Sequence, residues 1–261
     1  MGDMDHRTVL AKSLTEMSGW LRASTDWMRP GRSLISNVPV SHGASFTGHE
    51  FANVDRLQPP FCDICAFPFE YDEGEGVICA GCLASPPQFT RARAPFVYSD
   101  LISDMVLSLK RQGRRSGLSF FAQQMWGSGR SLIEEADYLV PVPLHYRRLA
   151  SRGFNQAGWL AEALSKVSGC PVRHDLMRRV KASQSQGHLS PQQRRANVAG
   201  AFSVPDHRLS QVRGRRIVLI DDVFTTGATV DACVRALKKA KAANVDVLTL
   251  ARVVSPRKAS I

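Results

Sequence analysis

Two neighbouring carboxylates, Asp221 and Asp222, stand shortly before a loop of small and hydroxylated residues. The members of that loop are Thr225, Thr226, Gly227, Ala228 and Thr229. Backbone N–H groups and threonine hydroxyls donate hydrogen bonds to an anion such as phosphate, whereas carboxylates accept hydrogen bonds from vicinal hydroxyls, as in ribose recognition. A ligand that carries both a phosphate and a ribose would satisfy both halves of this pattern.

The residues around this stretch have the pattern of a strand, a tight loop and a helix. Ile217 to Ile220 form a short apolar run rich in β-branched residues, which is typical of a strand buried on both faces of a parallel sheet. After the loop, apolar residues recur at helical spacing, at Val230, Cys233, Val234 and Leu237. The helix N-terminus and the loop then direct their N–H groups at one spot, so this corner is predicted to bind phosphate.

The whole stretch, RIVLIDDVFTTGAT from Arg216 to Thr229, closely resembles the phosphoribosyl pyrophosphate (PRPP)-binding motif of type I phosphoribosyltransferases. The resemblance implies that Asp221 and Asp222 are the catalytic acids that hold the ribose hydroxyls. It also implies that the loop through Thr229 cradles the 5′-phosphate. The alternatives are an ordinary strand-loop-helix corner and the acidic strand of a P-loop NTPase, but the sequence has no G-x-x-x-x-G-K-[ST] loop.

A second cationic loop follows another predicted strand, Tyr138 to Pro143. This loop, HYRRLASRGFNQ, offers backbone freedom at Gly153 and a helix cap at Asn155. Its cations are Arg147, Arg148 and Arg152. Such a cationic, amide-rich loop suits pyrophosphate. The stretch VPVPLHYRRLASRGFNQA is very similar to the corresponding stretch of ComF-family proteins, which are competence-associated and phosphoribosyltransferase-like, except that Tyr146 stands where proline is expected. The resemblance implies that this loop holds the pyrophosphate of PRPP.

Residues 173–202 separate the two loops and are polar in their middle part. Ser190-Pro191-Gln192-Gln193 has the spacing of a capping box, so a short helix carrying Arg194 and Arg195 is predicted to follow. In phosphoribosyltransferases the matching region is a flexible hood that closes over the site and excludes water. His188 could donate a proton there, and a solvent-facing histidine is the alternative reading.

Four cysteines are spaced as two C-x2-C pairs with thirteen residues between them. They are Cys62, Cys65, Cys79 and Cys82. Each pair points two sulfurs at one metal, so residues 61–85 are predicted to form a zinc ribbon with a structural, four-thiolate Zn²⁺. The segment is too short to bury a core, and metal binding would supply its folding energy. Disulfides or a redox pair are the alternatives. ComF-family proteins usually also begin with a zinc ribbon.

The rest of the chain completes the predicted organisation. Residues 1–60 are interpreted as an N-terminal arm, with one amphipathic helix between Leu10 and Leu21 and a loop or disordered segment after it. Residues 86–261 alternate between strand and helix patterns, which indicates an α/β domain with a parallel sheet. The expected fold is therefore a type I phosphoribosyltransferase-like domain, preceded by the small zinc ribbon.

Composition sets the remaining limits. The 261 residues carry a net charge of +11, and residues 101–261 hold 26 basic and 11 acidic side chains. That surplus suits a polyanionic substrate or a nucleic acid, and a solvated basic surface is the alternative. The sequence contains no apolar run long enough to span a bilayer and no signal-peptide pattern at its start, so no membrane insertion and a cytoplasmic location are expected.

Two functions follow from these patterns. The resemblance implies an enzyme that binds PRPP with Mg²⁺ and transfers its phosphoribosyl group to an acceptor that the sequence does not specify. The second hypothesis is an accessory protein of DNA uptake that binds single-stranded DNA or proteins of the competence machinery, with a regulatory or vestigial PRPP site.

Overall fold

The computed structural model describes residues 31–40, 45–72, 74–112, 117–181 and 191–254. By its contacts the chain divides into two compact units, Met1–Asn53 and Val54–Ile261. The amphipathic helix predicted between Leu10 and Leu21 lies outside the described residues. Among the helices of the described part, none is long and apolar enough to cross a membrane.

The first unit has regular structure where the sequence predicted an irregular segment. Strands β1 (Gly31–Arg32) and β2 (Pro39–Val40) pair antiparallel, and helix α2 spans Gly48–Asn53. A reciprocal capping box begins the helix: the Thr47 backbone N donates to Glu50 Oε2 at 2.7 Å, and the Glu50 backbone N donates to Thr47 Oγ1 at 3.2 Å. Burial raises the pKa of Glu50, but hydrogen bonds from Ser33, Ser36 and Thr47 outweigh it and lower the pKa to about 2.

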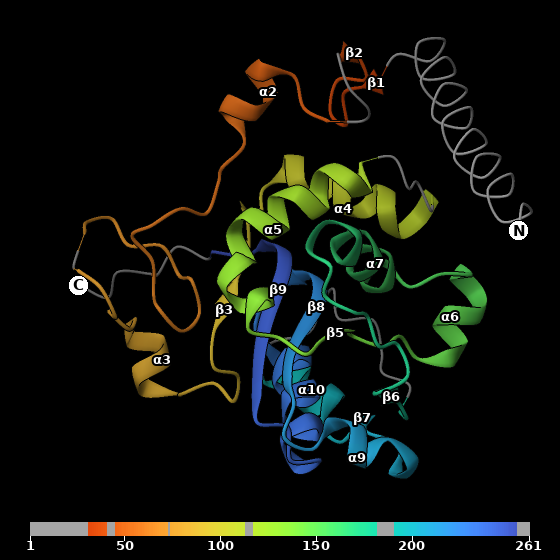
Figure 1. Ribbon diagram of the computed structural model, residues 1–261. Coiled ribbons are helices and arrows are strands. Elements are labelled where there is room, and N and C mark those ends of the chain that lie inside the picture. Colours follow the sequence, from red (N-terminus) through yellow and green to blue (C-terminus); the bar gives the residue numbers. More distant parts are fainter. Residues whose placement is uncertain (1–30, 41–44, 73, 113–116, 182–190, 255–261) are drawn as a thin grey trace, which may run out of the picture. The chain divides into compact units, whose positions relative to one another are not determined.

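The second unit is built on a parallel sheet, as the sequence predicted. Its strands are β3 (Ala92–Arg93), β4 (Phe96–Val97), β5 (Tyr138–Pro141), β8 (Arg216–Phe224) and β9 (Asn244–Arg252). Their order is β3-β9-β8-β5, with β4 also beside β9, and every pair is parallel (Figure 1). The α/β fold class is therefore confirmed. Strands β3 and β4 are two short pieces on either side of Ala94 and Pro95, and proline has no N–H with which to continue a ladder.

Strand β8 is longer than the apolar run that predicted it. Asp221 pairs in register with Thr249 of β9, and the pairing continues to Phe224 opposite Arg252. Asp221 and Asp222 therefore lie within the strand, not after it, because the ladder with β9 continues past the apolar residues. Only Thr225 to Gly227 remain as loop before helix α10 (Ala228–Lys239).

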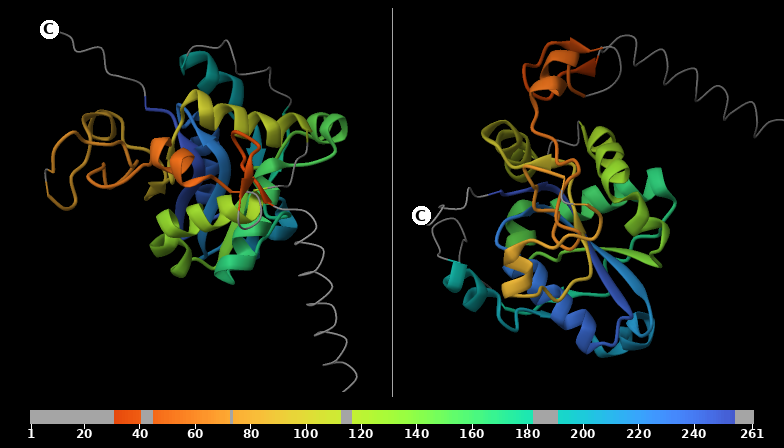
Figure 2. Two further views of the ribbon diagram at one scale, coloured as in Figure 1. Left: turned by 90° about the horizontal axis from the view of Figure 1, so that it is seen from above. Right: turned by 90° about the vertical axis from the view of Figure 1, so that its left-hand side faces the viewer.

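Helices cover both faces of this sheet (Figures 1 and 2). Helices α5 (Leu118–Glu134) and α7 (Gln156–Ser168) pack against each other and against the strands on one face. Helix α10 packs on the other face, together with α8 (Pro191–Val198) and β7 (Phe202–Ser203). On the α5 side, Gly129 permits close approach, because a Cβ there would lie 2.6 Å from Leu248 Cδ2.

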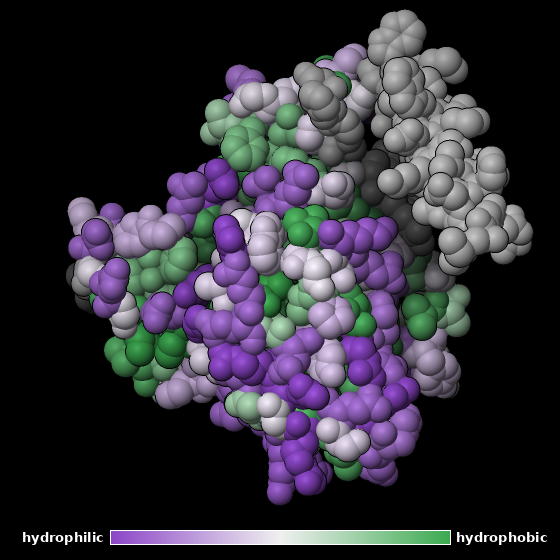
Figure 3. Space-filling model, in the orientation of Figure 1, coloured by the Kyte–Doolittle hydropathy of each residue, from purple (hydrophilic) through white to green (hydrophobic). Residues whose placement is uncertain are grey.

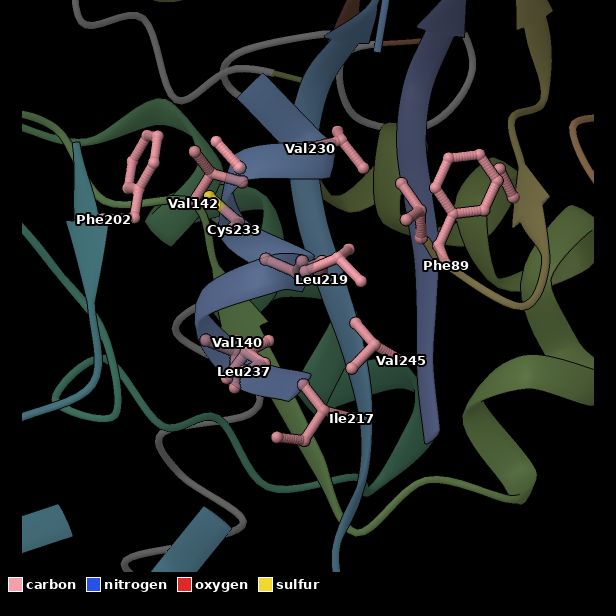
Figure 4. Packing of buried hydrophobic residues seen from close by; sticks show 14 of the residues in the cluster. Phe89, Val140, Val142, Phe202, Ile217, Leu219, Val230, Cys233, Leu237 and Val245 are labelled. Carbon is pink, nitrogen blue, oxygen red and sulfur yellow. The ribbon is translucent and has the colours of Figure 1, made fainter. Parts of the chain in front are cut away.

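The buried cluster under α10 follows the alternation of the strands (Figure 4). Ile217 and Leu219 of β8 point to this face, where they meet Val230, Cys233 and Leu237 of α10. Cys233 is fully buried, as expected for a residue on the apolar face of the predicted helix. This packing fixes the direction in which α10 starts, and hence the position of the loop before it.

Further elements complete the described part of the second unit. They are α3 (Ala80–Ala84), α4 (Asp100–Gln112), α6 (Tyr146–Arg152), β6 (Arg178–Arg179), which pairs antiparallel with β7, a 3-10 helix (Asp206–Arg208) and α9 (Leu209–Val212). On the face shown in Figure 3, hydrophilic side chains predominate over α9 and α10, and hydrophobic ones gather around α3. Leu83 of α3 is two-thirds exposed.

Candidate functional site

Four thiols converge in the ribbon segment, which we define as residues 61–85. The Sγ atoms of Cys62, Cys65, Cys79 and Cys82 all lie within 4.8 Å of one another, and all four residues are buried. The Sγ atoms of Cys65 and Cys79 are 3.7 Å apart. Zn–S bonds of about 2.3 Å place the sulfurs of a tetrahedral site about 3.8 Å apart, so the cluster has the dimensions of a four-thiolate zinc site. All six cysteines of the chain are described and free, which rules out the disulfide alternative in this structure.

Backbone N–H groups stabilise the thiolate of one cysteine of the cluster, Cys62. The N–H groups of Cys65 and Cys79 donate to Cys62 Sγ at 3.5 and 3.3 Å. Burial raises the pKa of the Cys62 thiol, but these backbone donors outweigh it and bring the pKa to about 7. Burial raises the pKa of the Cys65 thiol to about 11 and raises that of Cys82 as well. Metal ligands must be deprotonated, so a metal that binds here displaces the protons of these thiols.

The ribbon segment packs directly on the sheet. The Ala92 backbone N of β3 donates to Ile64 O at 2.6 Å, and Arg93 Nη1 donates to Asp63 O at 2.9 Å. At the end of β9, Arg252 Nη2 donates to Cys65 Sγ at 3.4 Å. The four cysteines consequently belong to the same buried cluster as the core beneath α10.

The predicted phosphate loop lies at the carboxyl end of β8. Asp221 and Asp222 are half-buried, and the Asp222 backbone N donates to Asp221 Oδ1 at 2.9 Å. Gly227 adopts a left-handed φ of 76° immediately before α10, and a Cβ there would lie 3.1 Å from Phe224 Cζ. The first N–H bonded within the helix is that of Asp231, to Gly227 O at 2.7 Å. The N–H groups before it in the first turn of an α-helix have no partner within the helix, so this corner has the donors that an anion needs.

The hydroxylated residues of this loop are placed differently. Thr225 is exposed, and Thr229 is half-buried in the first turn of α10. The Oγ1 atom of Thr226 is buried and has no hydrogen-bond partner within the described part of the chain. A buried hydroxyl without a partner is costly and is a common mark of a ligand site.

The second predicted anion loop follows β5, the neighbour of β8 in the sheet. The sequence predicted a loop from His145 to Gln156, but the structure has helix α6 there, because YRRLASR contains no helix breaker before Gly153. Arg147, Arg148 and Arg152 belong to this helix. Gly153 follows the helix with a left-handed φ of 76°. Asn155 is the N-cap residue of α7, as predicted, but its side chain makes no capping hydrogen bond, and its Nδ2 donates to Val142 O at 3.1 Å.

The region predicted to be a hood is partly described. The short helix predicted after Ser190 is present as α8, and it carries Arg194 and Arg195. Helix α8 packs against α10, the helix that follows the phosphate loop. His188 lies outside the described residues. The strands β6 and β7 connect this region to the body, where Arg179 Cζ lies 5.2 Å from the centroid of the Phe202 ring.

The parallel sheet, with the two predicted anion-binding segments after the neighbouring strands β5 and β8, has the architecture of a phosphoribosyltransferase-like α/β protein. Residues 149–260 match the family model described as "Phosphoribosyl transferase domain". The chain is 32% identical over 229 residues to the DNA utilization protein YhgH of Salmonella typhimurium, covering 85% of this chain and 97% of that protein. It is 28% identical to Competence protein ComFC of Bacillus subtilis, over 77% of this chain and 81% of that one. The chain therefore belongs to the ComF family.

Two solved structures share a limited likeness with this chain. Orotate phosphoribosyltransferase from Aeropyrum pernix is 16% identical, with a TM-score of 0.33 over 59% of this chain and 78% of that one. Glutamine PRPP amidotransferase from Bacillus subtilis is 20% identical, with a TM-score of 0.34 over 54% of this chain and 30% of that one.

Arg252, which the sequence analysis did not single out, lines a cavity beside Thr226 and Gly227. Its position at the end of the last predicted strand carries no motif, and its proximity to both Cys65 and Phe224 arises only when the ribbon segment packs on the sheet. The other predicted residues are distributed along the carboxyl edge, with Asp221 and Asp222 in β8 and the arginine-bearing helix α6 after β5.

Proposed function

We propose that this protein binds PRPP with Mg²⁺ and transfers the phosphoribosyl group to an acceptor, releasing pyrophosphate. The observation that carries the proposal is the pair Asp221 and Asp222 at the end of β8, followed by a glycine-containing loop at the N-terminus of α10. The family and the matching phosphoribosyl transferase domain support it. A structural Zn²⁺ in the ribbon segment and a cytoplasmic location, where thiols stay reduced, complete the proposal.

Each part of the site has a task in this scheme. The loop from Thr225 to Thr229 holds the 5′-phosphate through backbone N–H groups, with the positive end of the α10 dipole behind them. Asp221 and Asp222 accept hydrogen bonds from the two ribose hydroxyls. The arginines of α6 hold the pyrophosphate, and the segment around α8 closes over the site and excludes water.

The reaction is a substitution at the anomeric carbon of the ribose. The bond from that carbon to a pyrophosphate oxygen breaks, and the pyrophosphate leaves with the electron pair. A lone pair of the acceptor forms the new bond to the carbon, and the acceptor then loses its proton to solvent. Positive charge develops on the ribose during this step, and in the proposed site the negative charges of Asp221 and Asp222 stabilise it.

Mg²⁺ fits the donor set of this site. The carboxylates of Asp221 and Asp222 are half-buried hard oxygen donors at the sheet edge, of the kind that Mg²⁺ takes together with substrate oxygens. When bound, the ion would neutralise negative charge on the pyrophosphate.

Isothermal titration calorimetry with PRPP and Mg²⁺ tests the site. We expect the wild type to bind, and Asp221→Asn and Asp222→Asn each to bind more weakly while keeping the fold, because the amide preserves the shape of the side chain and removes its charge. Asp104→Asn, at an exposed position on α4, is the matched control and should bind as the wild type does. An absence of PRPP binding by the wild type would refute the site assignment, and equal binding by all four proteins would refute the roles of the two acids.

Pyrophosphate release separates a transferase from a PRPP-binding protein without catalysis. It should be measured with PRPP and Mg²⁺ across a panel of nucleobases, amines and glutamine. Release that depends on one acceptor establishes the transfer, whereas binding without release under every condition would leave PRPP as a regulatory ligand.

A second candidate function is the handling of DNA in natural transformation. The names of the relatives, DNA utilization protein and competence protein, favour it, as does the excess of basic side chains in residues 101–261. In this reading the protein binds single-stranded DNA or proteins of the competence machinery, and its PRPP site is regulatory or vestigial. Binding to a single strand should weaken steeply with salt. If neither single nor double strands bind at moderate salt, direct DNA binding is excluded.

A further inference from the structure

The start of α7 is fixed by contacts that do not involve the side chain of its N-cap residue, Asn155. Phe154 precedes the N-cap and Trp159 follows it by four positions, and their rings stack with centroids 4.2 Å apart and planes inclined by 13°. These are the positions of a hydrophobic staple, which sets the angle at which the chain enters a helix. The Trp159 backbone N also donates to Asn155 O at 3.1 Å, which closes the first turn.

The side chain of Asn155 makes a different contact. Asparagine is a favoured N-cap residue because its side-chain oxygen accepts a hydrogen bond from an N–H group in the first turn. In α7, which is described over its whole length, the side chain makes no such bond. Its Nδ2 instead donates to Val142 O at 3.1 Å, thirteen positions earlier in the chain. We call this bond between Asn155 and Val142 the clamp.

The clamp ends on a residue that is bonded to the strand of the two acids. Val142 is buried, and its backbone N donates to Ile220 O at 2.9 Å. Ile220 directly precedes Asp221 in β8. The clamp therefore closes the segment from Val142 to Asn155, which we call the α6 loop, onto a point of the sheet next to the acids. Helix α6 and its three arginines belong to this loop.

The chain turns between α6 and the clamp. Gly153 has a left-handed φ of 76°, and its N–H bonds back into α6, to Leu149 O at 2.7 Å. The side chain of Asn155 then links this turn to the sheet. PRPP carries its pyrophosphate and its ribose hydroxyls at a separation that is set by covalent bonds. A site that binds both ends of PRPP must therefore keep α6 at a defined distance from β8.

We propose that Asn155 is a positioning residue for PRPP, an inference that rests on the PRPP site proposed above. The clamp holds the α6 loop at the distance from β8 at which α6 binds the pyrophosphate while Asp221 and Asp222 bind the ribose of the same molecule. Asn155 does not touch the ligand. Loss of the clamp consequently weakens ligands that span both parts of the site and leaves ligands of either part alone unaffected.

Asn155→Ser separates the clamp from the helix cap. Serine caps helices about as well as asparagine does, but its hydroxyl is one bond closer to the backbone and does not reach Val142 O. Ser168→Ala is the matched control, because it removes another bond from a side chain to a backbone oxygen, from Ser168 Oγ to Leu164 O at 2.8 Å, at the opposite end of α7. Calorimetry in the presence of Mg²⁺ compares PRPP with ribose 5-phosphate, which lacks the pyrophosphate.

We expect Asn155→Ser to bind PRPP about fivefold more weakly than the wild type, a loss equivalent to one neutral hydrogen bond. It should bind ribose 5-phosphate as the wild type does, and Ser168→Ala should bind both ligands as the wild type does. If ribose 5-phosphate binds the wild type too weakly to measure, inorganic pyrophosphate takes its place and should also bind all three proteins equally. Thermal unfolding shows whether Asn155→Ser is folded. If it is not, Asn155→Asp, which keeps the shape but cannot donate, replaces it and should give the same pattern.

NMR relaxation tests the clamp without any ligand. The backbone order parameters of Leu149 and Gly153 should fall in Asn155→Ser and stay unchanged in Ser168→Ala, because only the first variant releases the α6 loop. Unchanged order parameters in Asn155→Ser would overturn the clamp.

The combined results separate this inference from the proposed function. If the wild type binds PRPP and Asn155→Ser binds it equally well, the positioning role is overturned and the PRPP site stands. Equal weakening of PRPP and of the one-ended ligand also overturns this role, because Asn155 would then support one part of the site and not the distance between the two. If the wild type does not bind PRPP, the proposed function and the positioning role are both overturned, and the order parameters alone decide whether the clamp holds the α6 loop.

Discussion

Replacing Gly227 by alanine tests the phosphate loop at its tightest point. Gly227 has a left-handed φ of 76°, and a Cβ there would lie 3.1 Å from Phe224 Cζ. A non-glycine residue in this conformation costs about 1–2 kcal/mol. The variant can relieve this strain if the backbone at position 227 rotates out of the left-handed region. That rotation would turn the N–H groups of the loop away from the 5′-phosphate that they are proposed to bind.

The same energy sets the expected loss of affinity. If PRPP binding requires the alanine at position 227 to return to the left-handed conformation, the binding free energy becomes about 1–2 kcal/mol less favourable. This corresponds to about 5- to 30-fold weaker binding. Calorimetry with PRPP and Mg²⁺ measures this ratio directly, and thermal unfolding of the free protein measures the accompanying loss of stability.

Gly169→Ala is a closely matched control for this experiment. Gly169 also has a φ of 76°, at the C-terminal end of α7, but a Cβ there meets nothing within 4 Å. This variant should lose about 1–2 kcal/mol of stability from the backbone conformation alone and should bind PRPP as the wild type does. If Gly227→Ala binds PRPP with unchanged affinity while Gly169→Ala behaves as expected, the loop is not the phosphate site.

Three further predictions concern the metal, the core and a buried acid. Elemental analysis should find one zinc per chain in the wild type and none in Cys79→Ser. Because the cysteines belong to the buried cluster of the second unit, loss of the zinc should lower the unfolding temperature of that whole unit. An unchanged unfolding temperature in zinc-free protein would contradict this. Gly129→Ala should destabilise the protein by about 1–3 kcal/mol in denaturant unfolding, because its Cβ would overlap Leu248, and a neutral effect would show that α5 can move away freely. Glu50 has a pKa lowered to about 2 from 4.5, so its contribution to stability is present above pH 4.5 and is lost as the pH falls towards 2; amide NMR shifts of Ser36 and Thr47 should follow this titration and become insensitive to pH in Glu50→Gln.

The sequence was a reliable guide where one local pattern determined the result. The apolar run before Asp221 predicted a buried parallel strand, and the spacing of Val230, Cys233 and Leu237 predicted α10. It was less reliable at boundaries that depend on a partner. Strand β8 continues through both acids because its pairing with β9 runs on from Asp221 opposite Thr249 to Phe224 opposite Arg252, and no residue within β8 indicates that partner.

The same division holds for the candidate site. The sequence by itself determined the residue types and their local spacing: two acids before a glycine-containing loop, arginines after a second strand, and two C-x2-C pairs. These are short-range patterns, in which a few consecutive residues decide the backbone and the available chemistry. Each C-x2-C pair brings its own two sulfurs together over a few residues, and the two pairs then lie close enough to share one metal ion, with all four sulfurs within 4.8 Å of one another.

Only the tertiary structure decided what lies beside the phosphate loop. Arg252 and Cys65 are 187 positions apart in the sequence, and their contact depends on packing of the ribbon segment against the end of β9. The cavity next to them is formed by that packing, and it takes its polar groups from β9, α10 and the loop before it. Such contacts between distant segments arise because side chains throughout the unit become buried together. The hydrophobic effect that drives this burial is non-directional, so neither residue of a contact carries a recognisable sequence motif.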